Sequence, residues 1–342
     1  MEVNSLTINK VFSSGGDVQY VLPHFQRAYA WERSEWQTLL NDTISIYDSD
    51  EPGSEPEHFM GAVVVIDDGM RSGTMPAFKL VDGQQRLITI SLLLCALSNL
   101  VDEESNLYRK IRKMLVNPDE EGELHYKILP TLKHSDRNAY LAILRGERDL
   151  PKVESRIVDA FSYYYRQLKS KLDVEGLDPE NLFKVVVQYM HVVFINLNQR
   201  ERPYEIFESL NAKGKPLTQP DLVRNYIAMR LPESIQENIF QQHWVRIEDM
   251  LNENRMVSRI GELTAFLRHY LAYRSGALPN KGHVYARFRD RIERQFPGSH
   301  EFINEIETLH RFANYYDRLL RPENEPDDDI RKVLQRLNIL SH

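Results

Sequence analysis

Residues 84–100 form a stretch that is apolar almost all round, and it limits the fold of the chain more than any other feature. A helix with hydrophobic side chains on every face has none to turn toward water, so it must lie inside a folded domain. A short β-type run, residues 78–81, leads directly into it. A longer run of the same kind, residues 59–66, stands upstream across a predicted loop and is typical of a buried strand. We therefore expect a sheet packed against a central helix.

The flanking segments extend this sheet and add helices to it. Residues 20–23 have the character of a short strand that ends in proline, and residues 34–47 have the apolar spacing of a helix with Ser34 as its N-cap. Residues 101–182 are expected to form surface helices. A third β-type run, residues 191–197, then follows, so we interpret the helices before it as an excursion from a single sheet-containing domain.

The remainder of the chain is predicted to be helical. Two helices are expected at residues 203–210 and 220–231, and every later segment has a helical pattern. The expected fold class is α+β, with a small mixed-sheet domain over residues 1–230 and a mostly helical domain over residues 231–342. We expect the natural chain to continue beyond His342.

The cysteine content and the hydrophobic pattern bear on the cellular compartment. Cys95, the single cysteine, lies inside the apolar stretch, which excludes a disulfide framework and suits a reducing compartment. Residues 1–10 lack the basic and then apolar layout of a signal peptide. The longest apolar run, residues 87–97, is too short to span a bilayer. We expect a cytoplasmic protein with no membrane partner.

Residues 82–86, Asp-Gly-Gln-Gln-Arg, stand between the second strand and the central helix and are the first candidate site. One interpretation is a capping box, in which Asp82 caps the helix and the Gln85 side chain reaches back to the cap amide. The other interpretation is functional. Gly83 permits close approach to the backbone, and the free amides of a helix start beside Arg86 form a phosphate cradle. The two glutamines can hydrogen-bond a base or a sugar. We favour the functional interpretation and keep the capping box as an open alternative.

Residues 23–31 form a second, weaker candidate that is rich in aromatic residues and contains Gln26, Arg27 and Tyr29. The segment either packs on the core as a loop or supplies donors and a stacking plane for a nucleotide. Its composition by itself leaves both interpretations open.

Residues 207–217 form a third candidate around a glycine-containing turn. Composition favours a helix C-terminus in which Asn211 and Gly214 are the cap and turn residues. Alternatively, Lys213 and Lys215 on this turn meet a phosphate. Asp221 is expected to cap or precede the helix that follows.

Charge is distributed unevenly along the chain. The net charge is −7, which argues against coating nucleic acid by bulk electrostatics. Residues 255–294 nevertheless hold nine Arg and Lys against three Asp and Glu, a local surplus of +6, with aromatic residues between them. This stretch is a candidate nucleic-acid face. A solvated helix surface, balanced by acids elsewhere, is the interpretation that we slightly favour.

Several familiar signatures of metal and nucleotide chemistry are missing from the sequence. It contains neither a Cys/His ligand cluster nor a Walker-type Gly-Lys-Ser/Thr loop. The eleven histidines are scattered, with no arrangement typical of a ββα-metal nuclease, and we expect each to be structural or at the surface.

The motifs in this order resemble the N-terminal half of the GmrSD modification-dependent restriction enzymes, a family also found in the SspE defence proteins. Its pattern joins a proline–aromatic–Gln–Arg–x–Tyr–x–Trp segment, a Phe–x–Gly strand, Asp–Gly–Gln–Gln–Arg, and Phe–x–x–x–Asn–x–x–Gly–x–x–Leu followed by Asp–Leu. The resemblance spans about residues 5–230. The matching positions are Phe25, Gln26, Arg27, Tyr29, Trp31, Phe59, Gly61, residues 82–86, Phe207, Asn211, Gly214, Leu217, Asp221 and Leu222.

The resemblance implies a ParB/sulfiredoxin-like fold and a module that binds and hydrolyses nucleoside triphosphates with Mg²⁺. In such systems hydrolysis and recognition of modified phage DNA control an HNH-type nuclease, which here would lie outside residues 1–342. It implies catalytic roles for Asp82 and Arg86, with Asp82 holding Mg²⁺ or orienting water. The implied nucleotide- or DNA-binding residues are Gln26, Arg27, Tyr29, Gly83, Gln84, Gln85, Asn211, Lys213 and Gly214.

Two other classes of function stay open. In one, the same glutamines and arginines grip DNA without any hydrolysis, and residues 255–294 extend the footprint. DNA affinity that falls steeply with salt would mark this class. In the other, a toxin–antitoxin or scaffold protein, the helical half mainly binds a protein partner.

Overall fold

The chain folds into two compact units, Met1–Gly214 and Lys215–His342. The first contains a mixed six-stranded sheet with helices, and the second is almost wholly helical. This architecture confirms the predicted α+β class. The computed structural model describes residues 2–13, 16–49, 58–71, 73, 75–131, 136–147, 155–197, 217–253, 255–257 and 259–340.

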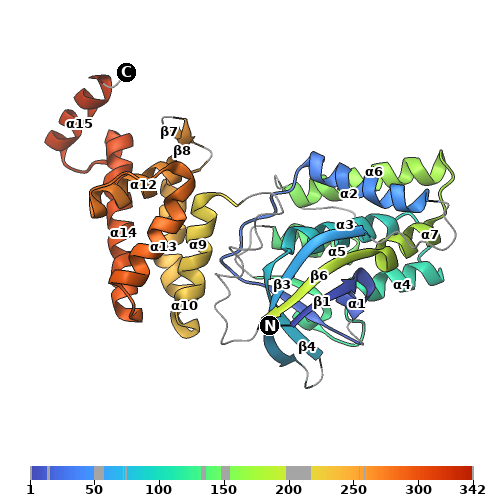
Figure 1. Cartoon of the computed structure of the whole chain (residues 1–342). Coiled ribbons are helices and arrows are strands. Elements are labelled where there is room, and N and C mark those ends of the chain that lie inside the picture. The colour runs from blue at the N-terminus through green and yellow to red at the C-terminus, as the bar shows by residue number, and fades with distance from the viewer. Residues whose placement is uncertain are drawn as a thin grey trace. The chain divides into compact units, whose positions relative to one another are not determined.

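The sheet of the first unit is mixed. Its strands are β1 (Glu2–Thr7), β2 (Gln19–Leu22), β3 (His58–Arg71), β4 (Met75–Asp82), β5 (Ile128–Pro130) and β6 (Met190–Leu197). They lie in the order β1–β6–β3–β4–β2–β5. β3 pairs antiparallel with β4 and parallel with β6, so the three longest strands lie side by side (Figure 1). β1 pairs antiparallel with β6, and β2 pairs parallel with both β4 and β5.

The hairpin of β3 and β4 is longer than predicted. The sequence predicts a loop over residues 67–76, but Asp67 pairs with Phe78 and the ladder ends only at Arg71 and Met75. The outer part of β3 is mostly exposed and polar, so it lacks the hydrophobic alternation that marks a strand. β1 and β5 are likewise missing from the predicted set, because one is an exposed edge strand and the other has three residues.

Helices cover one side of this sheet in layers, with α3 between the sheet and the α2–α6 pair (Figure 1). The helices are α1 (Ile8–Ser13), α2 (Arg33–Tyr47), α3 (Gln84–Ser98), α4 (Asn106–Leu115), α5 (Arg137–Arg145), α6 (Arg156–Asp173) and α7 (Pro179–Lys184), with a 3₁₀ turn at Gly122–His125 and a π-helical turn at Val185–Tyr189.

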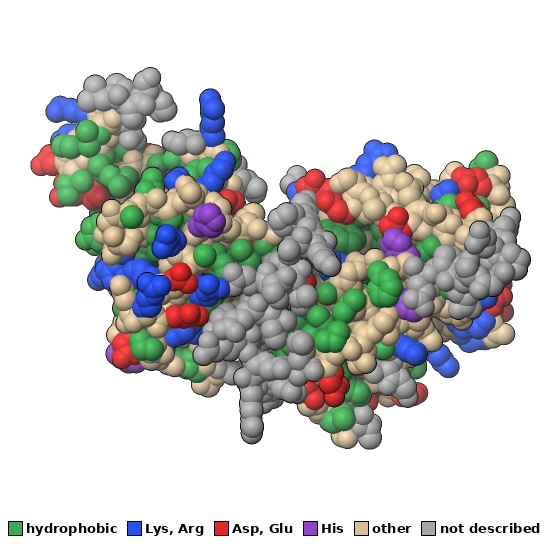
Figure 2. Space-filling view, in the orientation of Figure 1, with side chains coloured by type: hydrophobic (Ala, Val, Ile, Leu, Met, Phe, Trp, Pro, Cys, Tyr) green, Lys and Arg blue, Asp and Glu red, His purple; other side chains and the backbone are tan. Residues whose placement is uncertain are grey.

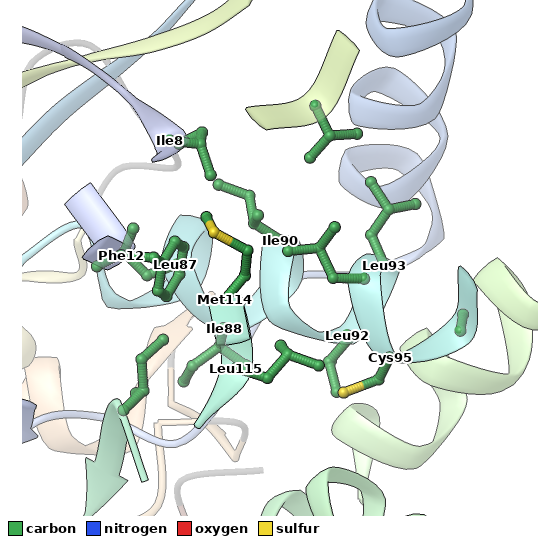
Figure 3. Packing of buried hydrophobic residues seen from close by; sticks show 14 of the residues in the cluster. Ile8, Phe12, Leu87, Ile88, Ile90, Leu92, Leu93, Cys95, Met114 and Leu115 are labelled. Carbon is green, nitrogen blue, oxygen red and sulfur yellow. The ribbon is translucent and has the colours of Figure 1, made fainter. Parts of the chain in front are cut away.

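α3 is the predicted central helix. Fourteen of its fifteen residues are buried, and the exception is Arg86 in the first turn. Figure 3 shows its side chains projecting in opposite directions, with Ile90 and Leu93 on one side and Leu92 and Cys95 on the other. The helix therefore anchors the core of the first unit, and only its beginning can meet a ligand.

Residues 101–182 differ from the expected helical excursion. β5 lies within them and pairs in parallel with β2, so this part of the chain returns to the edge of the sheet. α6 packs on α3 and α2, and most of α5 is buried. The segment is thus part of the core, because its apolar faces meet elements that are distant in sequence.

The second unit is a helical bundle with one very short hairpin. α12 packs against α9, α13 and α14. α9 therefore belongs to this unit, whereas the sequence placed it at the end of the first domain. The elements are α9 (Gln219–Arg230), α10 (Glu233–Ile239), the π-helical turn Phe240–Trp244, α11 (Val245–Met250), β7 (Met256–Val257), β8 (Ile260–Gly261), α12 (Glu262–Ser275), α13 (Val284–Gln295), α14 (Ser299–Leu320) and α15 (Asp328–Leu340), with 3₁₀ turns at Lys281–His283 and Pro322–Asn324.

Among the residues that the structure describes, no helix is both long enough and apolar enough to cross a membrane.

Candidate functional site

The corner between β4 and α3 is built around Gly83. This residue is the N-cap of α3 and has φ = 90°, in the left-handed region, and no side chain caps the helix. The predicted capping box through Asp82 and Gln85 is therefore wrong. A Cβ atom on Gly83 would lie 2.9 Å from Val63 Cγ2 and 3.0 Å from the Ala62 carbonyl oxygen. Both the backbone conformation and the closeness of β3 thus require glycine.

β3 holds the guanidinium group of Arg86 in place. Arg86 Nη1 donates to the carbonyl oxygen of Ala62 at 2.9 Å. Gly61, with φ = 105°, lies beneath the same group, and a Cβ atom there would come within 2.9 Å of Arg86 Nη2. The pairing of β3 with β6 shifts register between Phe59 and Ala62, which places this irregularity at the site. Sequence reasoning gave Gly61 no role, although an isolated glycine in a β-type run is the signal for such a close approach.

Asp82 lies within the electrostatic influence of two arginines. Its half-buried carboxyl group accepts a hydrogen bond from the Gly83 amide and feels the positive charges of Arg86 and Arg27. Burial is the largest influence and raises the pKa of Asp82 above its ordinary value, while Arg86, the Gly83 amide and Arg27 act in the opposite direction. Keeping this carboxylate charged in the folded protein therefore costs free energy. Groups with such perturbed pKa values are frequent at functional sites.

The raised pKa of Asp82 leads to a prediction about stability. Because the folded-state pKa lies above the unfolded-state value, the folded state binds the proton more tightly. The charged carboxylate therefore destabilises the fold at every pH above its folded-state pKa, and this effect disappears as the pH falls below the unfolded-state value. We expect Asp82→Asn to be at least as stable as the wild type at pH 7, with an advantage that narrows toward acid pH.

Urea denaturation of both proteins over a pH series measures this difference. A clear loss of stability of Asp82→Asn at neutral pH would contradict the prediction, because it would mean that attraction to the two arginines outweighs the burial of the carboxylate.

Glutamine side chains clamp the 23–31 loop onto this corner. Gln26 Nε2 donates to the carbonyl oxygen of Val81 at 2.8 Å. Gln85 Oε1 accepts from the amides of Ala30 at 2.8 Å and Trp31 at 3.3 Å. Both glutamines were predicted to bind a ligand. In the structure both side chains form hydrogen bonds with main-chain groups. Their contribution to a site is thus to position the loop.

The side-chain amide of Gln84 forms a hydrogen bond through its nitrogen but not through its oxygen, among the residues described. Its Nε2 donates to the carbonyl oxygen of Arg27 at 3.3 Å, which helps to hold Arg27 beside Asp82. Its Oε1 is buried and has no hydrogen-bond partner among the described residues. A buried acceptor without a donor is unfavourable, so this oxygen is suited to receive a donor from a ligand.

Tyr29 is a core residue. Its side chain is 3% exposed, and its hydroxyl group meets Thr89 Oγ1 at 2.6 Å and accepts from Trp36 Nε1 at 2.9 Å. Burial raises the pKa of its phenol above the ordinary value. The expected stacking plane for a base is therefore not offered by Tyr29, which packs on α3 because its aromatic body finds more apolar surface there.

The third candidate motif cannot be placed at this corner. Asn211, Lys213 and Gly214 lie outside the described residues. Asp221, which was expected to cap or precede the helix, lies inside its first turn, where it completes a capping box with the N-cap residue Thr218 at the start of α9.

A hollow of about 660 Å³ in the first unit lies elsewhere, between α2 and α6, and none of the predicted site residues lines it.

The fit of a magnesium ion can be judged from the donors present. Among the described residues, no group of three or more Asp, Glu, His or Cys could hold a metal ion. Asp82 is a single carboxylate under the electrostatic influence of Arg86 and Arg27. Magnesium in nucleotide sites is commonly bound by one or two carboxylates together with the phosphates of the substrate. Asp82 therefore fits Mg²⁺ as one ligand beside a triphosphate, and does not form a separate metal site.

Comparison with known families gives one match. Residues 8–228 match the profile of the family described as GmrSD restriction endonuclease, N-terminal domain. This span contains the whole corner and reaches into α9. No curated protein matches the chain by sequence.

Proposed function

The chain belongs to the family of GmrSD restriction endonuclease N-terminal domains, and from that premise we propose that it binds and hydrolyses a nucleoside triphosphate at the corner of β4 and α3. Family membership supports a part in a restriction system. The observation that carries the proposal is the pair of arginines beside Asp82 at the uncapped beginning of α3.

The groups at this corner suit a polyphosphate. A helix start supplies amides and the positive end of the helix dipole. Arg86 adds a guanidinium group whose position is fixed by Ala62 and Gly61, and Arg27 adds a second positive charge. Fixed donors of this kind stabilise the charge that develops on a phosphoryl group in transfer. Gln84 Oε1 remains as an acceptor for a hydroxyl or amino group of the ligand.

In hydrolysis, a water oxygen forms a bond to the γ-phosphorus, and the bond from that phosphorus to the bridging oxygen breaks. The products are a nucleoside diphosphate and inorganic phosphate. Arg86 and Arg27 would bind the phosphate oxygens. Asp82 would either orient the water and accept its proton or hold Mg²⁺, whose charge would neutralise part of that of the phosphates.

The remaining parts of the proposal rest on the family alone. We propose that nucleotide turnover is coupled to recognition of modified phage DNA and to control of an HNH-type nuclease that lies outside residues 1–342. The described residues support no particular nucleotide and no particular DNA modification.

Phosphate release from a panel of nucleoside triphosphates, by the full chain with Mg²⁺, tests the hydrolytic proposal. We expect turnover by the wild type and a loss of at least about a hundredfold in Asp82→Asn, since positioned acid–base groups contribute that much. Asp68→Asn is the matched control. It removes the same charge from the same hairpin, where Asp68 pairs with Arg71 and Lys79.

Equal turnover by Asp82→Asn and Asp68→Asn would remove Asp82 from the reaction. A wild-type chain that neither binds nor hydrolyses any nucleotide, yet binds DNA with a steep dependence on salt, would establish the non-enzymatic class in its place.

A further inference from the structure

The second unit contains an arginine-lined hollow of about 560 Å³ between the end of α12 and α13. Its basic lining residues are Arg274, Arg287, Arg291 and Arg294, and we call it the arginine pocket. It lies outside residues 8–228, the span that matches the family. The pocket is therefore a feature separate from the corner in the first unit.

Three of these arginines come from one face of α13. Arg287, Arg291 and Arg294 are spaced i, i+4 and i+7, so their side chains leave the same side of the helix. Like charges at this spacing repel and destabilise a helix. Asp290 also lines the pocket but pairs with Arg289 at 3.3 Å. An anion bound against these arginines would relieve this repulsion.

Arg291 forms the floor of the pocket. Its side chain is 8% exposed, and its Nη1 lies 3.1 Å from Glu305 Oε1. Its Nε is buried and donates to no acceptor among the described residues. Burial lowers the pKa of this guanidinium, with Glu305 acting in the opposite direction. Arg291 thus places an incompletely hydrogen-bonded cation in the lining of the pocket.

Glu305 does not neutralise the pocket. Its carboxylate also accepts a hydrogen bond from the hydroxyl group of Tyr270 and another, at 3.2 Å, from Nη2 of Arg274. Arg287 and Arg294 are exposed and make no ion pair with any residue that the structure describes. With Asp290 paired to Arg289, the four lining arginines have only Glu305 as a further carboxylate partner among the described residues, so positive charge predominates in the pocket.

We propose that the arginine pocket binds a phosphate group. Planar guanidinium groups present paired donors that match phosphate oxygens, and the exposed Arg287 and Arg294 offer such donors beside the buried charge of Arg291. The phosphate belongs either to a nucleic-acid backbone or to a free phosphate compound. Figure 2 shows basic side chains, with acidic ones among them, gathered over α12–α14 of this unit. The site does not depend on nucleotide hydrolysis in the first unit.

Arg287→Gln/Arg294→Gln in the full chain is the test variant, because both residues are exposed and their replacement leaves the buried Arg291–Glu305 pair intact. Arg311→Gln/Arg336→Gln is the control, since it removes two exposed charges from α14 and α15. All proteins also carry Arg86→Ala, so that phosphate binding at the corner does not interfere. Circular dichroism verifies that each variant is folded.

Two ligands distinguish the sources of the phosphate. Inorganic phosphate is titrated by calorimetry at constant ionic strength, and a DNA duplex by fluorescence anisotropy over a salt series. We expect the test variant, unlike the control, to bind phosphate at least about tenfold more weakly. If nucleic acid is the source, DNA affinity also falls and its logarithmic salt dependence becomes shallower by about 1–2. Unchanged DNA affinity with lost phosphate binding would assign a free phosphate compound.

Equal binding of both ligands by the test variant and the control would overturn the proposal. Nucleotide turnover, measured with Arg86 restored, is expected to be the same in both variants. A failure at the arginine pocket is therefore separate from a failure of the proposed hydrolysis.

Discussion

Replacing Gly83 with alanine is expected to lower the free energy of unfolding by about 2–5 kcal/mol. An L-residue in the left-handed conformation costs roughly 1–2 kcal/mol, and inserting a methyl group into a closely packed place costs about 1–3 kcal/mol more. Gly83 incurs both terms, since its φ is 90° and a Cβ atom would lie 2.9 Å from Val63 Cγ2. Urea denaturation followed by circular dichroism measures the loss.

Gly69→Ala is the matched control for this prediction. Gly69 has φ = 83° in the same hairpin, but a Cβ atom there would meet nothing within 4 Å. We expect it to lose only the conformational part, about 1–2 kcal/mol. Equal losses in the two variants would show that the closeness of β3 to Gly83 places no limit on the side chain.

Replacing Arg86 with alanine is expected to weaken nucleotide binding by about tenfold to a hundredfold. A charge-assisted contact between guanidinium and phosphate contributes on the order of 1.5–3 kcal/mol. Arg86 is held by Ala62 and by the space above Gly61, so little freedom is lost when the ligand binds. Arg86→Lys is expected to fall between alanine and wild type, because lysine keeps the charge without the planar pair of donors.

Arg71→Ala is the control for the Arg86 variants. It lies on the same hairpin and pairs with Asp68, away from the corner. Equilibrium titration with a fluorescent nucleotide compares the three variants with the wild type, and thermal unfolding shows whether they are folded. Wild-type affinity in Arg86→Ala would place the phosphates elsewhere and would remove the main support for the proposed site.

The position of the corner could be predicted from local sequence. A strand, a glycine and a helix that is apolar all round place residues 82–86 at a junction, and the start of a helix favours anions wherever it occurs. The contacts of the glutamines could not be predicted in this way. Gln26 and Gln85 bind main-chain groups of segments more than fifty residues away, and hydrophobic periodicity contains no information about such partners.

The choice between the two interpretations of Tyr29 depends on contacts of the same kind. Its sequence context suits both a stacking plane and a core residue, and only the approach of Thr89 and Trp36 places its ring inside. The capping-box interpretation is wrong because Gly83, and not Asp82, is the N-cap residue, and because the Gln85 side chain accepts a hydrogen bond from the Ala30 amide of the loop.

In the second unit, periodicity predicted helices over the basic stretch but could not distinguish a solvated surface from a binding site. Arg287, Arg291 and Arg294 share a face of α13 by spacing alone. The packing of α13 against α12 and the placement of Glu305 bury Arg291 and leave its Nε unused. Repeats of three to four residues follow from helix geometry, which is local. Burial, close approach and hydrogen-bond partners depend on which distant segments pack together, and these are properties of the tertiary structure.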